Sequence, residues 1–558
     1  MTDQELGLGR CVVYQVYPRS FQDSNGDGIG DLPGITSRLD YLADLGIDYL
    51  WLTPIFVSPM NDNGYDIADY RSIDPVFGTM ADFEELVFEA GKRGISIMLD
   101  MVFNHSSTSH EWFRRAVAGE KRYQDYYLFR EGAPDAPPTN WISKFGGSAW
   151  AWSAEVGKWY LHLFDASQAD LNWENPAVID ELADIVRFWR DKGVGGFRFD
   201  VVNLISKPDA LEDDFEGDGR RFYTDGPRVH EHIRKLVEKA RISDMLTVGE
   251  MSSTSIDNCV LYSAPQNEEL AMTFSFHHLK VDYGDGNKWT LKEPDIAELR
   301  RLFTSWQDEM TEGGGWNALF WSNHDQPRPV TRFACGGELR ATSAKMLATC
   351  IHLMRGTPYI YQGEELGMVN PGFTRIDQYR DVESTNYYGI LRGEGMGEGE
   401  ALAILAERSR DNARTPMQWS AEKCAGFTAG TPWIEVAGNY HEINAESQLG
   451  DEDSVLAYYR RLIRLRRRMT IIQSGDVRFL SEDELGGAEK IIAYERSYGG
   501  ERLLVLCSFD EREALLPRGL VTDGARVLIG NRADSVAGLA LDGETFTLRP
   551  FEAVALIS

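Results

Sequence analysis

Short β-rich segments alternate with helical stretches along most of this chain, and the alternation limits the folds it can adopt. Parallel strands need long crossovers, usually helices, so this order predicts an α/β class fold, a (β/α)8 TIM barrel. The eight strand candidates are 11–17, 49–52, 96–102, 196–200, 246–250, 272–276, 317–321 and 359–361. Helical patterns near 37–45, 82–93, 176–192, 227–241 and 340–354 fall between or just before them.

Two parts of the chain depart from the alternation. About 90 residues separate the third strand candidate from the fourth, far more than a usual connection. From about residue 476 the pattern changes to short alternating runs with Gly and Asp turns, which favours an antiparallel β-domain. We therefore expect a catalytic barrel over 1–103 and 176–475, an inserted domain over 104–175 and a C-terminal antiparallel β-sandwich domain over 476–558. The polar stretch 385–410 is expected to lie as a surface segment over the barrel mouth.

Charge and composition exclude several classes of protein. The 558 residues include 87 acidic and 57 basic side chains, a formal net charge of −30, which disfavours bulk nucleic-acid binding. No apolar run approaches the roughly 18 residues of a membrane span, and the N-terminus lacks a basic region followed by an apolar one. We expect a cytoplasmic enzyme, a monomer or weak homo-oligomer, whose partner is a small molecule and not a membrane. The six cysteines are scattered and are expected to be reduced thiols.

Carboxylates close three of the strand candidates. "GFRFD" ends at Asp200, "LTVGE" ends at Glu250, and "ALFWSNHD" runs on to Asp325. Reacting groups of barrel enzymes gather at the C-terminal ends of the strands, and burying a carboxylate without purpose is costly. Three such acids on different strands of one barrel therefore predict an active site.

The neighbours of these acids suggest how the roles divide. Arg198 lies two residues before Asp200, so both side chains share a strand face, and the guanidinium favours an ionised carboxylate. An ionised Asp suits a nucleophile, although a structural ion pair would explain the same spacing. Glu250 has no basic neighbour in sequence, so we expect a raised pKa and proton donation. His105 and His324 can donate hydrogen bonds to sugar hydroxyls.

These motifs resemble the α-amylase family of glycoside hydrolases. The matching strings, in order, are "YQVYPRSF" (14–21), "DNGYD" (62–66), "DMVFNH" (100–105), "GFRFD" (196–200), "VGE" (248–250) and "NHD" (323–325). The resemblance implies a barrel, an insertion after strand three and a C-terminal β-domain. It implies Asp200 as nucleophile, Glu250 as general acid/base and Asp325 as stabiliser of the transition state. By motif position, the residues that hold the sugar would be Asp62, Tyr65, His105, Arg198, His324 and Arg414.

The resemblance also implies a retaining mechanism, which needs no cofactor for its chemistry. Such a mechanism requires carboxyl groups about 5–5.5 Å apart, whereas an inverting one needs roughly 6.5–9.5 Å. We therefore expect the shorter separation between Asp200 and Glu250.

A loop near the N-terminus predicts a structural cation site. "DSNGDGIGD" places oxygens at Asp23, Asn25, Asp27, the Ile29 carbonyl and Asp31, an alternation that resembles an EF-hand loop. The twelfth position is Gly34 rather than a bidentate Glu, so the loop is not an EF-hand. We expect Ca²⁺ or Mg²⁺ here, and a metal-free Asp/Asn/Gly loop is the alternative.

Further strings narrow the resemblance to the oligo-1,6-glucosidase branch of the family, among them "FDVVNLISK" (199–207), "VGEMSSTS" (248–255) and "TPYIYQGEELGM" (357–368). Val201, after the nucleophile, is the residue type this branch uses for substrates other than α-1,4 glucosides. The implied substrate is a sugar phosphate, trehalose 6-phosphate, split into glucose and glucose 6-phosphate.

A phosphate dianion needs basic side chains, and the segment after the Glu250 strand carries several in an acidic chain. The phosphate-binding candidates are His278, Lys280 and Lys288, with Arg220 and Arg221 as weaker ones, although a solvated basic face would show the same residues. One alternative activity is cleavage of unphosphorylated isomalto-oligosaccharides. A non-catalytic barrel is disfavoured because all three acids are present.

Overall fold

The structure is a computed structural model that describes residues 7–532, 534–535 and 543–558. Within these residues, eight parallel strands form one sheet in which each strand pairs with the next along the chain. The strands are β1 (Val13–Val16), β2 (Tyr49–Leu52), β5 (Ser96–Met101), β11 (Gly196–Phe199), β12 (Leu246–Met251), β13 (Met272–Ser275), β14 (Ala318–Leu319) and β15 (Thr357–Tyr361). A parallel bridge between Thr273 and Asn317 joins β13 to the β14 side and closes the barrel. The predicted fold class is confirmed.

Helices cover the outside of the barrel, and several of them have strong start signals. The longer ones are α4 (Met80–Lys92), α7 (Pro176–Asp191), α9 (Val229–Ala240), α11 (Ile296–Glu312), α13 (Arg340–His352) and α18 (Val455–Arg468). Thr79 and Asp82 form a capping box at the start of α4, and Asn175 caps α7, where Pro176 stands at the first position. These devices satisfy backbone N–H groups at the helix starts and fix where each helix leaves its loop.

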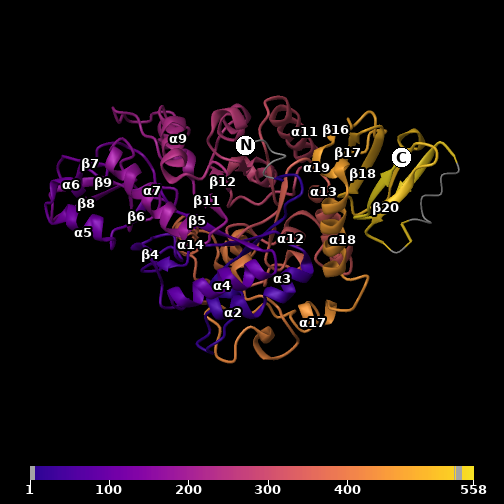
Figure 1. The fold of residues 1–558 in the computed structure, drawn as a ribbon, viewed down its shortest axis with the longest axis horizontal. Helices are drawn as coiled ribbons and strands as arrows, with labels where there is room; N and C mark the ends of the chain where they lie inside the picture. Colours follow the sequence, from indigo (N-terminus) through magenta and orange to yellow (C-terminus); the bar gives the residue numbers. More distant parts are fainter. Residues whose placement is uncertain (1–6, 533, 536–542) are drawn as a thin grey trace.

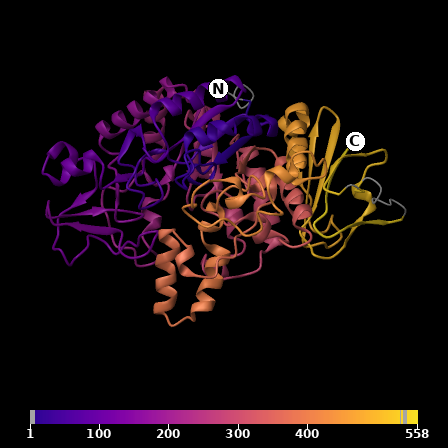
Figure 2. The same cartoon turned by 90° about the horizontal axis from the view of Figure 1, so that it is seen from below.

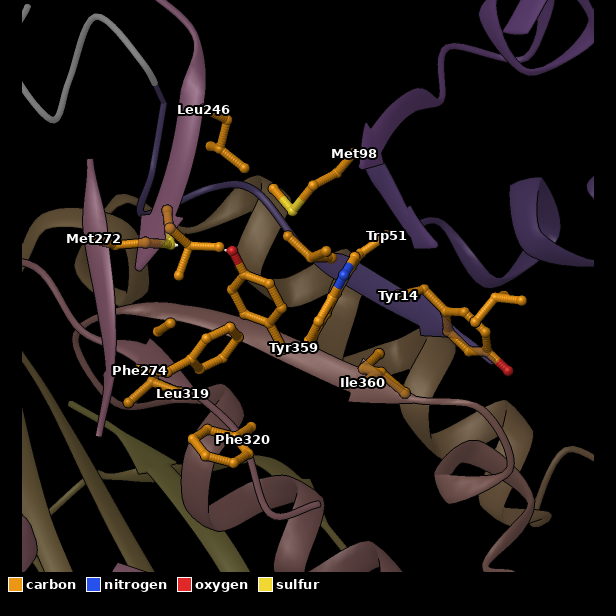
Figure 3. Packing of buried hydrophobic residues seen from close by; sticks show 14 of the residues in the cluster. Tyr14, Trp51, Met98, Leu246, Met272, Phe274, Leu319, Phe320, Tyr359 and Ile360 are labelled. Atoms are coloured by element: carbon orange, nitrogen blue, oxygen red, sulfur yellow. Dashed lines mark hydrogen bonds between the residues drawn. The ribbon is translucent and has the colours of Figure 1, made fainter. Parts of the chain in front are cut away.

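Aromatic side chains fill the interior of the barrel. Figure 3 shows Trp51, Phe274 and Tyr359 from three strands packed together, with ring centroids 5.8 Å apart for the first two and 4.5 Å for the last two. The Tyr359 hydroxyl contacts the sulfur of Met272. A filled interior leaves the C-terminal ends of the strands as the place where a ligand can bind.

The segment between β5 and α7, which the structure describes in full, holds short elements of its own. They are β6 (His105–Ser107), α5 (Glu111–Val117), α6 (Lys121–Gln124), β7 (Phe129–Arg130), β8 (Trp150–Ser153), β9 (Lys158–Leu161) and β10 (Gln168–Asp170). Strands β7, β9 and β8 form an antiparallel sheet, and β10 pairs antiparallel with β6. The segment lies at one side of the barrel (Figure 1, violet, left).

The described part of the tail forms an antiparallel sheet on the opposite side of the barrel (Figure 1, yellow). Its strands are β16 (Asp476–Phe479), β17 (Ile491–Tyr498), β18 (Glu501–Ser508), β22 (Ala553–Ile557) and β20 (Arg526–Gly530), in that order. A two-stranded ribbon, β19 (Ala514–Pro517) with β21 (Thr545–Leu548), covers one face. Alternate residues of β18 explain the two layers, because Leu504 and Leu506 pack towards the ribbon while Leu503 and Val505 join the barrel core.

The stretch 385–410, expected as a surface segment, is mostly helical. Helices α14 (Val382–Gly393) and α15 (Glu398–Arg408) form a pair that projects from the barrel (Figure 2, orange). Glu383, on the first turn of α14, lines the cavity described below. Among the described residues, no helix is both long and apolar enough to cross a membrane.

Candidate active site

The three predicted acids line one cavity of about 350 Å³ at the C-terminal ends of the barrel strands. Asp200 directly follows β11, Glu250 lies near the end of β12, and Asp325 follows β14. Barrel topology thus brings together carboxylates that are 50 to 125 positions apart in the chain, as numbered in the sequence. A buried cluster of carboxylates in a cleft is the arrangement expected for acid–base and nucleophilic chemistry.

Arg198 bridges Asp200 and Glu250. Its Nη1 donates to Asp200 Oδ1 at 2.8 Å and to Asp100 Oδ1 at 2.6 Å, and its Nη2 contacts Glu250 Oε2. The predicted pairing with Asp200 is present. Glu250 has no basic neighbour in sequence, but adjacent parallel strands place Arg198 beside it in space. One guanidinium therefore orients both carboxylates towards the same cavity.

Burial separates the protonation behaviour of the acids. Desolvation raises the pKa of Asp200 to about 7, although Arg198 opposes the rise. The sequence suggested that Arg198 would keep the pKa of Asp200 low, but the opposing effect of burial is larger. Burial also acts on Asp325, yet His324, Arg410 and Arg414 together hold the pKa of Asp325 far below its ordinary value. Asp325 thus carries a fixed negative charge, which suits stabilisation of a cationic transition state.

The backbone turns sharply after Asp200. Val201 has φ +33° and ψ +41°, a left-handed conformation that is costly for a β-branched residue. Its side chain lines the cavity beside Asp200 and packs with Leu204 and with Trp141 of the inserted segment. The strain is held by that packing and keeps Val201 at the cavity wall.

The predicted sugar-holding residues divide into two layers. Asp62, Tyr65 and His105 line the cavity. Arg198, His324 and Arg414 are almost fully buried behind it. Arg414 donates to Asp325 Oδ1 at 2.6 Å, and the His324 ring stacks on that of Tyr65 with centroids 5.2 Å apart. The second group therefore positions residues that line the cavity, such as Tyr65 and Asp325, instead of facing the cavity itself.

Arg410 lines the cavity but was not singled out from the sequence. Its Nη2 lies 3.2 Å from Asp62 Oδ1, its Nη1 lies 3.4 Å from Asp325 Oδ1, and its Nε donates to Asp381, the N-cap of α14. The string "SRDNARTPMQW" contains it four residues before Arg414, so a signal was available. The inserted segment adds Gln168, whose Nε2 donates to Asp62 Oδ2 at 3.1 Å.

Besides Arg410, four cationic side chains line the same cavity: Lys144, Arg220, Lys280 and Lys288. Lys280 and Lys288 were predicted candidates and Arg220 a weaker one, whereas Lys144 was missed because it belongs to the distant inserted segment.

Two other candidates lie elsewhere. The His278 ring is buried against Phe303 and Phe320, and its Nε2 faces the Phe320 carbonyl at 2.8 Å. Arg221 points outward and pairs with Asp214 and Glu216. Neither lines the cavity.

The N-terminal loop folds tightly around its own oxygens. Asp23 Oδ1 accepts N–H bonds from Asn25 and Gly26, and Asp23 Oδ2 accepts one from Gly28. Asp31 caps α2 (Leu32–Ser37) and also accepts from Ser24. Burial acts to raise the pKa of Asp23, but these hydrogen bonds and one from Thr428 outweigh burial and lower that pKa.

The donor chemistry of this loop is mixed. Across the described residues, no group of three or more His, Cys, Asp or Glu side chains is arranged to hold a metal ion. Carboxylate, amide and carbonyl oxygens together are nevertheless the ligands that Ca²⁺ takes, and each can accept more than one interaction. The predicted ligands therefore fit a hard cation by type.

A barrel with a nucleophile-type Asp, a second acid bridged to it by one Arg, and a third fixed carboxylate defines a glycoside hydrolase. A comparison with protein families matches residues 15–475 to the alpha amylase catalytic domain. The chain belongs to the α-amylase family, and it is an enzyme that hydrolyses glycosides.

Full-length relatives support the same family. The chain is 52% identical to trehalose-6-phosphate hydrolase of Bacillus subtilis (strain 168), covering 99% of this chain and 98% of the relative. It is 46% identical to oligo-1,6-glucosidase of Parageobacillus thermoglucosidasius over 97% of each chain. The crystal structure of trehalose-6-phosphate hydrolase from Bacillus licheniformis superposes with a TM-score of 0.92 at 51% identity, covering 98% of this chain and 99% of the other.

Proposed function

We propose that this enzyme hydrolyses trehalose 6-phosphate to glucose and glucose 6-phosphate with retention of configuration. The observation that carries the proposal is the group of four cationic side chains that line the cavity in addition to Arg410, in a chain whose net charge is −30. A phosphate dianion needs such donors, and an unphosphorylated glucoside does not. The names of two relatives at 52% identity support the same substrate.

The residues of the cavity fit a double displacement. Glu250 protonates the glycosidic oxygen while Asp200 attacks the anomeric carbon, so the C–O bond to the leaving sugar breaks as the glucosyl–Asp200 ester forms. Glu250, now a carboxylate, takes a proton from water, and that water displaces Asp200 and releases glucose. Asp325 stabilises the cationic transition state of both steps.

Product analysis tests the proposal. With trehalose 6-phosphate, glucose and glucose 6-phosphate form in equal amounts, and kcat/KM exceeds that for isomaltose by about tenfold or more, as expected for one charge-assisted contact. Coupled glucose 6-phosphate dehydrogenase measures the phosphorylated product. Equal or faster cleavage of isomaltose would instead favour the oligo-1,6-glucosidase activity, which the relative at 46% identity also suggests.

We also propose that Asp23, Asn25, Asp27, the Ile29 carbonyl and Asp31 hold a structural Ca²⁺ or Mg²⁺. The loop packs on 427–433, where Trp433 N–H donates to the Gly28 carbonyl, so a cation would stabilise this contact. Saturating Ca²⁺ at 100 times its Kd would stabilise the fold by about 2.7 kcal/mol.

Calorimetry after chelation measures this effect as a change in Tm. Asp27→Ala removes an exposed ligand and abolishes the Ca²⁺-dependent part of Tm, whereas Asp44→Ala, at an exposed position outside the loop, keeps it. A Tm that ignores both chelator and Ca²⁺ rules the site out.

We also propose an oligomeric state and a cellular location for the enzyme. A cytoplasmic enzyme that acts as a monomer or weak homo-oligomer suits a small phosphorylated substrate and an acidic surface. Cell fractionation and light scattering measure the two properties.

A further inference from the structure

The inserted segment contributes one cation to the active-site cavity. Lys144 lies on the loop between β7 and β8, whereas the Lys and Arg side chains that share the cavity with it come from the barrel part of the chain. The loop is held at Lys144 and at the two residues before it: Ile142 N–H donates to the Asp218 carbonyl, Lys144 N–H donates to the Leu163 carbonyl, and Ser143 Oγ donates to the Phe164 carbonyl. Lys144 is therefore presented from a fixed backbone.

The side chain reaches the strand that carries the general acid. Lys144 Nζ donates to Ser252 Oγ at 3.2 Å, and Ser252 lies two residues after Glu250. The ammonium also lies 5.7 Å from the ring centroid of Tyr223. Since Glu250 protonates the leaving oxygen, a group beside Ser252 faces the departing sugar.

Arg410 pairs with Asp62, Asp325 and Asp381, and the other four cavity cations differ in their partners. Lys288 pairs with Glu383 at 2.6 Å, and Arg220 makes a two-pronged contact with Asp218. Among the described residues, no carboxylate lies within ion-pair distance of Lys144 or Lys280, and Lys280 is the more exposed of these two. Within the part of the chain that the structure describes, Lys144 is thus a half-buried cation without a carboxylate partner, so its charge is available to a ligand.

Leaving an ammonium desolvated without a carboxylate is costly. Burial, with Arg220 and Lys280 nearby, lowers the pKa of Lys144 to about 8 although Asp218 opposes this. A bound dianion would reverse that cost, because charge-assisted hydrogen bonds from Lys to phosphate are strong. The site is therefore built for an anion.

We propose that Lys144 binds the phosphate of the leaving glucose 6-phosphate unit and sets the preference for phosphorylated over unphosphorylated disaccharides. The inference rests on the proposed function and assigns its specificity to the inserted segment. Lys280 and Arg220 line the same cavity and can share the phosphate, and the hydrogen bond to Ser252 Oγ holds the Lys144 ammonium.

The test is a ratio of specificities. In Lys144→Gln, the ratio of kcat/KM for trehalose 6-phosphate to that for isomaltose falls about 10- to 100-fold, the loss expected for one charge-assisted contact. The change appears mainly in KM for the phosphorylated substrate. Lys144→Arg, which keeps the charge, retains most of the ratio. Arg221→Gln, which removes a nearby cation outside the cavity, is the matched control and keeps the wild-type ratio.

Binding of glucose 6-phosphate, measured by calorimetry, provides a second readout. Lys144→Gln raises its Kd about tenfold or more, while the Kd for glucose changes little. If the wild type prefers trehalose 6-phosphate and Lys144→Gln keeps both the ratio and the Kd, the role of Lys144 is refuted and the proposed function stands. If the wild type does not cleave trehalose 6-phosphate, the proposed function fails and the inference fails with it.

Discussion

Asp200→Asn lowers kcat/KM for trehalose 6-phosphate by about 10⁴-fold or more, the scale seen when a nucleophile is removed. The amide cannot attack the anomeric carbon, so no glucosyl–enzyme forms. The fold persists, because Asn still accepts a hydrogen bond from Arg198 and Asp100 still pairs with that guanidinium. Because burial raises the pKa of Asp200, the fold disfavours its ionised form, and a neutral amide in its place costs little stability.

Initial rates and calorimetry measure the two halves of this expectation. Asp44→Asn, at an exposed position, is the control for the same chemical change elsewhere. Asp200→Ala guards against slow deamidation of Asn back to Asp, since Ala cannot revert. Turnover above about 1% of wild type in both variants would remove Asp200 from the nucleophile role.

The fold was predictable because its main signals are local. Each barrel strand carries its own apolar run, and several outer helices their own caps, so the eight strand candidates overlap the strands found. Successive side chains of β18 likewise alternate between two hydrophobic cores, as the two-residue period of a strand predicts. The pair α14 and α15 was missed as helices because polarity identified the stretch as surface without revealing its period.

The acids of the site were predictable for a related reason, since strand-ending carboxylates at 200, 250 and 325 must meet at one barrel end. The contacts between side chains of neighbouring strands were not predictable from the sequence. Sequence spacing showed Arg198 beside Asp200 only, whereas the register of β11 against β12 also brings it to Glu250. Lys144 comes from the insertion, so its place near the barrel mouth depends on how a whole segment docks.

His278 shows the opposite error. A basic segment after the acid/base strand predicted phosphate ligands, but the short helix of His277–Lys280 turns successive side chains to different sides. Lys280 faces the cavity while His278 packs into the barrel wall beside Phe320. Charge pattern alone identifies the segment, and backbone geometry selects which of its residues can touch a ligand.

Glu250→Gln has the second large effect, and its size depends on the leaving group. For a sugar leaving group, which needs a proton, kcat/KM falls about 10²- to 10⁴-fold because general acid catalysis is lost. For p-nitrophenyl α-glucoside, whose phenolate leaves without help, formation of the glucosyl–enzyme falls much less. Water then attacks slowly because the base is missing, so a burst of nitrophenol precedes a slow steady state.

Azide separates an acid/base role for Glu250 from a merely structural one. Azide is already anionic and needs no base, so it restores turnover of p-nitrophenyl α-glucoside in Glu250→Ala and forms α-glucosyl azide, with the configuration retained. Asp200→Ala gives no such product, because a single displacement by azide at an α-glucoside would yield the β anomer. An α product from the Glu250 variant therefore requires a covalent intermediate on the opposite face of the sugar. Loss of activity equal for both leaving groups, with no azide rescue, would mean that Glu250 acts only by holding Arg198, and the double displacement would have to be abandoned.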